Sequence, residues 1–257
     1  MTRTDRTGTA VADALVLTRR NLLHYVRIPS LIVFSTVTPV MFVVLFGYVF
    51  GGAIDIPGFS YIDYLMPGIF VQTVAFGAMQ TGIGLAEDMS KGMVDRLRSL
   101  PMARSAVLVG RTAADTTRNF LVVGLMAGVG LLIGFRFHNG LVPAVAGLGL
   151  VVLFAHAFSW ISATIGLSLG SVESAQSSGL VWVFPLTFAS SIFVPVETMP
   201  GWLEAFATVN PVTHVVDALR ALFLGGPATS PVLWSLAWIG GILAVFVPLS
   251  VSRFRRL

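Results

Sequence analysis

The chain carries a strongly charged stretch, EDMSKGMVDRLRSLPMARS (residues 87–105), between two long apolar runs. Seven of its nineteen residues are charged, whereas the runs on either side have almost no charge. Its apolar side chains recur at helical spacing and share one face of a helix: Met89, Met93, Leu97 and Leu100. Pro101 cannot continue that helix. The stretch therefore predicts a short amphipathic helix over residues 87–100.

Composition places the surrounding chain in a membrane. Of the 257 residues, 55% are hydrophobic and 11% are charged, whereas a soluble domain carries roughly 25% charged residues. The net charge of +4 is compatible with nucleic-acid binding, but its distribution along the chain fits membrane topology better, and we expect no nucleic-acid partner. The chain has no cysteine, which excludes disulfides and thiolate metal sites.

Apolar runs of the length of a transmembrane helix, about 20 residues, occur six times. The sequence therefore predicts an all-α integral membrane protein with six spans, at residues 31–50, 64–86, 119–135, 141–170, 178–196 and 232–251.

Basic residues predict the orientation of these spans. Fourteen of the sixteen lie before the first span, between the second and third spans, or after the last span. Since basic loops stay in the cytoplasm, both termini are expected there, and the bilayer is expected to be a bacterial cytoplasmic membrane. The arginine-rich composition fits a bacterial genome of high GC content.

A basic amphipathic segment, residues 13–28, precedes the first span and is followed by Pro29. It is typical of a helix that lies in the membrane interface. An orientation signal without a mechanical role is the alternative.

The charged stretch itself has two interpretations. Its apolar face could dock a cytosolic partner, for which flexible methionines are well suited, or it could rest on the membrane with a solvated opposite face. Arg111, Asp115 and Arg118 follow at helical spacing, so they can pair along one face. We expect them to extend the third helix into the cytosol as an ordinary helix end, with a conducting site as the alternative.

Residues 193–226 are too polar to span and too apolar for a plain loop. Pro200 can open one short helix, Asn210 and Pro211 read as the N-cap and first position of a second, and Gly225 and Gly226 end it. The pattern predicts a re-entrant helical hairpin at residues 200–224, on the extracellular side. It is either a passive cap or a gate whose residues are Trp202, Phe206, Asn210 and Arg220.

Several chemistries are missing from the sequence. There is no phosphate-binding G-x-x-x-x-G-K-[ST] loop, and the four histidines lack metal-ligand spacing. We expect no catalytic residue, no metal and no cofactor on this chain. His156 lies inside a predicted span, where a neutral imidazole bonded to Ser159 or to a backbone carbonyl is expected over a functional role.

Three glycine pairs with G-x-x-x-G spacing favour close helix packing; they are Gly124/Gly128, Gly130/Gly134 and Gly166/Gly170.

The stretch GMVDRLRSLPMARSAVLVGRTAADTTRN (residues 92–119) resembles the cytoplasmic motif of the type-2 ATP-binding-cassette (ABC) export permeases. LMPGIF (residues 65–70) and residues 193–226 fit that family as well, closest to its daunorubicin-resistance branch. The resemblance covers nearly the whole chain. It implies two six-span permease halves, this chain twice or with a related one, docked on two copies of a cytoplasmic ABC ATPase that binds ATP and Mg.

The same resemblance implies roles for particular segments. Residues 87–100 would be the coupling helix that contacts the ATPase, through Glu87, Asp88, Met89, Met93, Arg96, Leu97 and Leu100. Spans one, two and five would line a pathway for a drug, polyketide or lipid. We expect Phe42, Phe46, Phe70 and Phe193 as its walls, and Gln72 and Gln80 as polar contacts or as bonds between helices.

Two other functions remain open on the residues alone. A proton-driven secondary transporter needs carboxylates deep inside its spans, and the predicted span cores contain none. A membrane enzyme, such as an acyltransferase, needs clustered polar groups, for which His156 and Ser159 are the only candidates.

Overall fold

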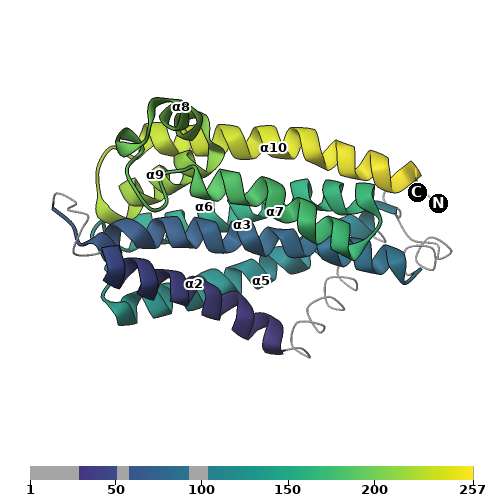
Figure 1. Ribbon diagram of the computed structural model, residues 1–257, viewed down its shortest axis with the longest axis horizontal. Helices are drawn as coiled ribbons and strands as arrows, with labels where there is room; N and C mark the ends of the chain where they lie inside the picture. Colours follow the sequence, from purple (N-terminus) through teal and green to yellow (C-terminus); the bar gives the residue numbers. More distant parts are fainter. Residues whose placement is uncertain (1–28, 51–57, 93–103, 257) are drawn as a thin grey trace.

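The computed structural model describes residues 29–50, 58–92 and 104–256, and within these ranges the chain is helical without a strand. The predicted interfacial helix at 13–28 lies outside them. The helices run roughly along the long axis of the molecule (Figure 1). Their bounds are α2 (Pro29–Phe50), α3 (Tyr61–Ser90), α5 (Arg104–Ile133), α6 (Leu141–Leu169), α7 (Val172–Phe188), a 3-10 turn η1 (Val196–Thr198), α8 (Gly201–Val209), α9 (Pro211–Leu224) and α10 (Thr229–Arg256).

Four helices among the described residues are long and apolar enough to cross a bilayer: α3, α6, and parts of α5 and α10. The apolar α2 has 22 residues and α7 has 17. This all-helical arrangement agrees with the predicted class of an integral membrane protein.

Three predicted boundaries differ from the structure. The predicted fifth span, 178–196, corresponds to α7, which begins at Val172 and ends at Phe188. It ends there because Asn210 Nδ2 donates to the carbonyl oxygens of Leu186 and Ala189, at 2.8 and 2.7 Å. These bonds satisfy acceptors that the helix end leaves open, and the chain turns before residue 196.

The predicted third span, 119–135, corresponds to α5, which begins fifteen residues earlier, at Arg104. The predicted coupling helix, 87–100, does not begin as a separate helix. Residues 87–90 form the last turn of α3, and Gly92 adopts a φ of +63°, which ends a right-handed helix. Met89 therefore belongs to α3, whereas the rest of the predicted coupling helix, residues 93–100, lies outside the described ranges.

Helix α3 occupies the centre of the bundle and packs most extensively against α6. A methyl group on Gly166 of α6 would overlap the carbonyl of Gly82 on α3, and one on Gly82 would overlap the carbonyl of Ser162. Of the predicted glycine pairs, Gly166 thus makes a close helix contact, whereas Gly124 and Gly128 face open space.

The two ends of the bundle differ. The short helices α8 and α9 lie at one end, while α10 and α3 end at the other (Figure 1). As the sequence predicts, Asn210 caps α9 by accepting from Val212 N, and Gly225 and Gly226 follow α9 with positive φ angles of 106° and 120°. The short helices exist where they are predicted; their depth in a bilayer is a proposal.

Candidate functional site

A cavity of about 460 Å³ lies between α2, α3, α5 and α7. This volume is in the range of sites for drug-sized ligands. Of the six residues predicted to line a pathway, the structure places Phe42, Gln72 and Gln80 in its wall. The complete lining comprises Thr38, Pro39, Phe42, Gln72, Thr73, Phe76, Gly77, Met79, Gln80, Ile83, Arg118, Asn119, Val122, Gln176, Leu180 and Phe184.

Aromatic rings extend from this cavity in a continuous column. Phe76 meets Phe184 at 5.6 Å between ring centroids, Phe184 stacks on Phe188 at 4.8 Å, and Phe188 stacks on Phe193 at 5.3 Å. Phe193 in turn stacks on Phe46 at 4.5 Å. These separations are those of favourable aromatic pairs. The column connects the cavity with the loop that follows α7.

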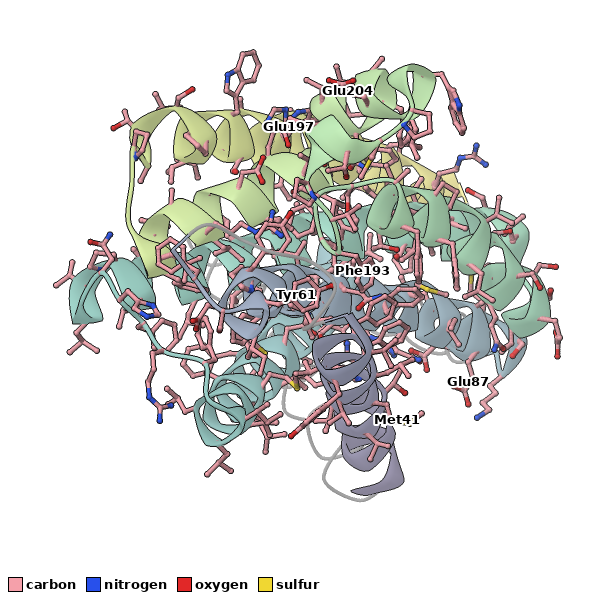
Figure 2. All side chains as sticks on the ribbon, turned by 60° about the vertical axis from the view of Figure 1, so that its left-hand side comes forward. Met41, Tyr61, Glu87, Phe193, Glu197 and Glu204 are labelled. Atoms are coloured by element: carbon pink, nitrogen blue, oxygen red, sulfur yellow. The ribbon has the colours of Figure 1, made fainter. Side chains whose placement is uncertain are left out.

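The far end of the column lies beside the start of α3. The Tyr61 hydroxyl donates to the Phe193 carbonyl at 3.1 Å, and Figure 2 shows these two residues next to each other, away from Glu87 at the other end of α3. The predicted wall residue Phe70 is elsewhere. It is fully buried and packs edge-on against Phe135, which follows α5, and Phe223 of α9. It therefore belongs to the core.

One wall of the cavity is polar. Gln72, Arg118 and Asn119 line it with 4%, 8% and 2% exposure. Arg118 Nη2 donates to the Gly77 carbonyl at 2.7 Å and to Asn119 Oδ1 at 3.3 Å. A methyl group at Gly77 would lie 3.3 Å from the guanidinium, so the glycine leaves room for the arginine to approach the backbone of α3.

A ladder of charged side chains continues from this wall along α3 and α5. Asp115 is fully buried, accepts from Thr81 Oγ1 at 2.6 Å, and lies 3.6 Å from Arg111 Nε. Arg111 Nη1 also lies 3.5 Å from Asp88 near the end of α3. The predicted pairing along one face of α5 is therefore present. The predicted extension of the third helix before residue 119 is also present, and α5 packs Asp115 against α3. The cytosolic position of this helix end stays a prediction.

The residues predicted to contact an ATPase are only partly described. Glu87, Asp88 and Met89 lie in the last turn of α3, whereas Met93, Arg96, Leu97 and Leu100 fall outside the described ranges. Glu87 Oε1 accepts from Lys91 Nζ at 2.5 Å on the surface, and this hydrogen bond raises the pKa of Lys91. Met89 is half-buried and packs against a small core cluster that includes Leu85.

His156 takes partners other than the predicted ones. Its Nε2 accepts from Trp160 Nε1 at 3.1 Å, and its Nδ1 lies 2.9 Å from Thr116 Oγ1, which donates to the Thr112 carbonyl. These roles assign the proton of a neutral imidazole to Nδ1. Ser159 donates instead to the Ala155 carbonyl, so the structure provides no His156–Ser159 pair for an acyltransferase.

The predicted gate residues divide into two groups. Trp202 and Phe206 on α8 are 76% and 41% exposed. Asn210 is buried and caps α9. Arg220 joins α9 to its neighbours, and we call its contacts the clamp. Its Nη2 donates to the Ser191 carbonyl at 2.6 Å, and its guanidinium lies 3.6 Å from the centre of the Tyr64 ring. This cation–π contact ties α9 to α3.

Asp217 completes the clamp by accepting from Ser191 Oγ at 2.9 Å and from Arg220 Nη1 at 3.3 Å. Burial raises the pKa of Asp217, and this effect outweighs the opposing influence of the Arg220 guanidinium. No group of three His, Asp or Glu side chains within the described ranges is placed to hold a metal ion.

Sequence reasoning missed several residues of the site. Phe184 and Phe188 are four residues apart on α7, a spacing that could have revealed an aromatic face. The sequence predicts Arg118 just before the third span and Asn119 as the first residue of that span. No local pattern shows that the extended α5 turns them toward α3.

Comparisons with known proteins agree with this architecture. A family described as ABC-2 type transporter matches residues 13–224. The chain is 33% identical to the daunorubicin resistance ABC transporter permease protein DrrB1 of Streptomyces coeruleorubidus, over 96% of this chain and 88% of the relative. It is 30% identical to the probable doxorubicin resistance ABC transporter permease protein DrrC of Mycobacterium tuberculosis, over 96% and 89% of the two chains. The probable multidrug ABC transporter permease YbhR of Escherichia coli is 24% identical, over 71% and 49%.

Proposed function

Because the chain belongs to the ABC-2 type transporter family and is the membrane permease subunit of an ABC exporter, we propose that it moves a hydrophobic or amphiphilic cargo outward through the cavity between α2, α3, α5 and α7. ATP is hydrolysed by a separate ATPase partner. Drugs, polyketides and lipids are the proposed cargo classes, supported by the drug-resistance names of two relatives.

The observation that carries this proposal is the connection between the cavity and one end of the bundle. Asp88 contacts Arg111, Arg111 contacts Asp115, and Arg118 on the same helix lines the cavity. A displacement of the end of α3 would therefore be transmitted to the cavity wall by the packed and ion-paired contacts between α3 and α5, and not by a flexible loop. Such contiguous networks are a physical route for coupling between distant sites.

The proposed cycle follows from this connection. Two copies of the ATPase close on ATP and Mg and displace the segment 87–100, which acts as the coupling segment. Helices α2 and α3 then move as nearly rigid bodies, and the cavity opens toward the end of the bundle that carries α8 and α9. The cargo leaves along the aromatic column, with Trp202 and Phe206 of the re-entrant hairpin as the outer gate.

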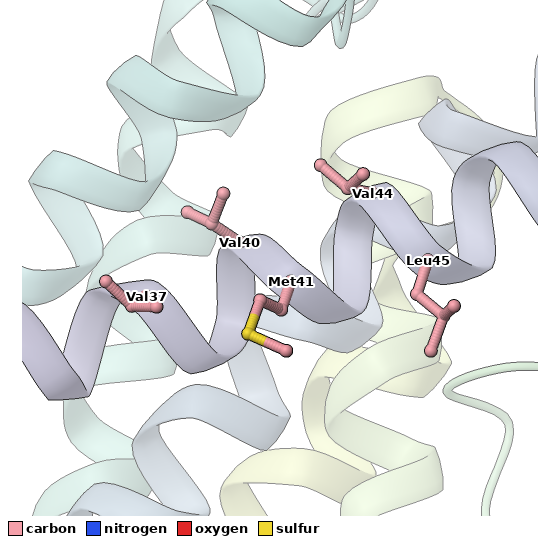
Figure 3. A pocket seen from close by; sticks show the side chains of 5 residues that line it. All are labelled: Val37, Val40, Met41, Val44 and Leu45. Carbon is pink, nitrogen blue, oxygen red and sulfur yellow. The ribbon is translucent and has the colours of Figure 1, made fainter.

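A second permease half, either another copy or a related chain, is proposed to face α2. The outward side of α2 is apolar and carries a shallow pocket lined by Val37, Val40, Met41, Val44 and Leu45 (Figure 3). Met41 is 64% exposed. Because the chain has no cysteine, Met41→Cys introduces a single thiol at this face.

Oxidative cross-linking of the Met41→Cys variant in membranes tests this pairing. A cross-linked dimer is expected if two copies meet there, and a disulfide to a cysteine introduced at the matching position of a related chain would identify that chain as the second half. Val145→Cys on α6, 60% exposed, is the matched control and should stay monomeric. A cross-link at Val145 and none at Met41 contradicts the arrangement.

Orientation is tested with the same cysteine-free background. Both termini and the coupling segment are proposed to be cytoplasmic in a bacterial cytoplasmic membrane. In intact cells, Met93→Cys should be protected from a membrane-impermeant thiol reagent, whereas Trp202→Cys should be labelled. The reverse pattern would place the coupling segment outside and overturn the proposed function.

The coupling role is tested by charge insertion. Replacing Met93 or Leu97 by Asp should prevent co-purification of the ATPase, or leave ATP hydrolysis that no longer drives export. An Asp at Leu249 on the exposed face of α10 would itself disturb membrane insertion, so Ser174→Asp, exposed in the first turn of α7, is the milder control. Assembly and transport that survive both coupling changes would exclude the docking role.

A further inference from the structure

We propose that the cavity holds the head group of an anionic amphiphile whose carboxylate or phosphate oxygens accept hydrogen bonds from Gln72, Asn119 and Arg118. This inference rests on the proposed export function and specifies the cargo class. It is carried by buried donors in the cavity wall.

Two of these donors have no acceptor among the residues that the structure describes. Gln72 Nε2 and Asn119 Nδ2 are buried, and neither finds a hydrogen-bond partner within the described part of the chain. Leaving a buried amide donor unsatisfied is costly, so proteins rarely do so without a reason. Both residues line the same cavity, which indicates that the acceptor arrives from within it.

The orientation of Asn119 is set by its neighbour. Arg118 Nη2 donates to Asn119 Oδ1 at 3.3 Å, and only the oxygen of the amide can accept that bond. The nitrogen is therefore the group that Asn119 leaves for a ligand. Gln72 on α3 is a second residue of the cavity wall whose buried amide nitrogen has no partner within the described chain, so unsatisfied donors of two helices belong to one wall.

The charge of the wall matches these donors. Arg118 is the one charged side chain among the described residues that line the cavity, and no Asp or Glu is among them. Asp115, three residues earlier, is engaged by Thr81 and Arg111 on another part of the α3–α5 contact. A guanidinium beside amide donors attracts carboxylates and phosphates, and it disfavours a cationic head group.

The remainder of the wall suits an apolar body. Phe42, Phe76 and Phe184 line the cavity, and the aromatic column leads away from Phe184. Gln80 and Gln176 are exposed and lie at its open side, whereas Gln72 and Asn119 are deep. An amphiphile would thus insert its head group against the donors and lay its body along the rings.

The test uses the full chain in nanodiscs of phosphatidylcholine and three probes with one ring system: pyrenebutyrate, pyrenebutanol and pyrenebutylamine. Specific binding is the uptake by nanodiscs that carry the chain minus the uptake by empty nanodiscs. We expect pyrenebutyrate to bind about ten-fold more tightly than pyrenebutylamine, as hydrogen bonds to a charged group imply.

Variants locate the site. Arg118→Gln should bring the three affinities to within about two-fold, and Gln72→Met should weaken only pyrenebutyrate, by about five-fold. Arg253→Gln, an exposed charge at the end of α10, should leave every affinity unchanged. If Arg118→Gln does not fold, as judged by gel filtration, the probe series and Gln72→Met still decide, because the Gln72 nitrogen makes no bond to the described chain.

Equal or tighter binding of pyrenebutylamine overturns the inference, as does the absence of chain-dependent binding of all three probes. Neither result contradicts the proposed export function, because that function is tested separately by assembly with the ATPase and by ATP-coupled export. Conversely, a chain that binds pyrenebutyrate selectively but never assembles with an ATPase would retain the anion site and lose the export function.

Discussion

Asp115 of α5 accepts a hydrogen bond from the Thr81 hydroxyl of α3 across 2.6 Å, and both side chains are fully buried. A carboxylate inside a helix bundle is stable only when it is bonded and paired. Arg111, at 3.6 Å, supplies the opposite charge. This contact joins the cavity side of α5 to the end of α3 that is proposed to meet the ATPase.

Removing the charge of Asp115 should weaken this joint. In Asp115→Asn the Thr81 bond survives, but Arg111 loses a buried partner, and breaking a buried pair costs about 3–5 kcal/mol. We expect a lower midpoint in a thermal unfolding series in detergent, together with reduced export per ATP hydrolysed. Glu173→Gln, an exposed carboxylate at the start of α7, is the control, and equal behaviour of the two variants would contradict the role of the ladder.

Gly84 should not tolerate a side chain. A methyl group there would overlap the guanidinium of Arg111. This side chain can move away only by giving up its bond to the Gln80 carbonyl and its ion pairs with Asp88 and Asp115, and breaking a partly buried ion pair is destabilising. Gly84→Ala should therefore lower the unfolding midpoint and displace Arg111 from Asp88. Gly124→Ala is the matched change, because nothing lies within 4 Å of that position; a destabilised Gly124→Ala with an unaffected Gly84→Ala would show the contact to be misplaced.

Arg220 should resist replacement by lysine. Its guanidinium bonds to the Ser191 carbonyl and covers the Tyr64 ring, and an ammonium cannot reproduce this planar, multidentate contact. Arg220→Lys is expected to speed hydrogen exchange in α9 and to lower stability by about 1–2 kcal/mol.

The control for that change is Arg136→Lys, because Arg136 is exposed and its guanidinium bonds only to carbonyls of its own segment in the described contacts. Its backbone N donates to Asp63 Oδ1 on α3, and this bond is kept in the lysine variant. If hydrogen exchange in α9 and in α3 is no faster in Arg220→Lys than in the unchanged chain, the contacts of Arg220 do not stabilise the packing of α9 on α3.

The aromatic column should affect transport more than folding. Phe188→Leu keeps an apolar side chain but removes the stacking of Phe188 on Phe184 and Phe193. We expect export to fall several-fold while ATPase assembly is retained, since each aromatic pair contributes about 0.5–1.5 kcal/mol beyond burial. Phe120→Leu on the exposed face of α5, 66% exposed, should export normally, and an equal loss there would separate the column from the pathway.

Sequence reasoning reached some elements and not others for physical reasons. The positions of the spans can be predicted from uninterrupted apolar runs. In lipid, backbone N–H and C=O groups find no water to bond, so an apolar run forms a helix that satisfies its own hydrogen bonds. The Asn210 cap and the Gly225–Gly226 stop follow from local backbone chemistry and occur as predicted. The C-terminal end of α7 differs from its predicted place because a distant residue, Asn210, bonds to the carbonyls there.

The sequence by itself determined the membrane class, the family and the places of the short helices, since these depend on composition, local spacing and backbone preference. Only the tertiary structure decided that Asp115 is buried, that Phe70 is core, and that Gln72 and Asn119 from two helices face one cavity. The physical reason is that such contacts join residues more than thirty positions apart in the chain. Periodicity specifies which face of a helix is apolar, but packing specifies what that face meets.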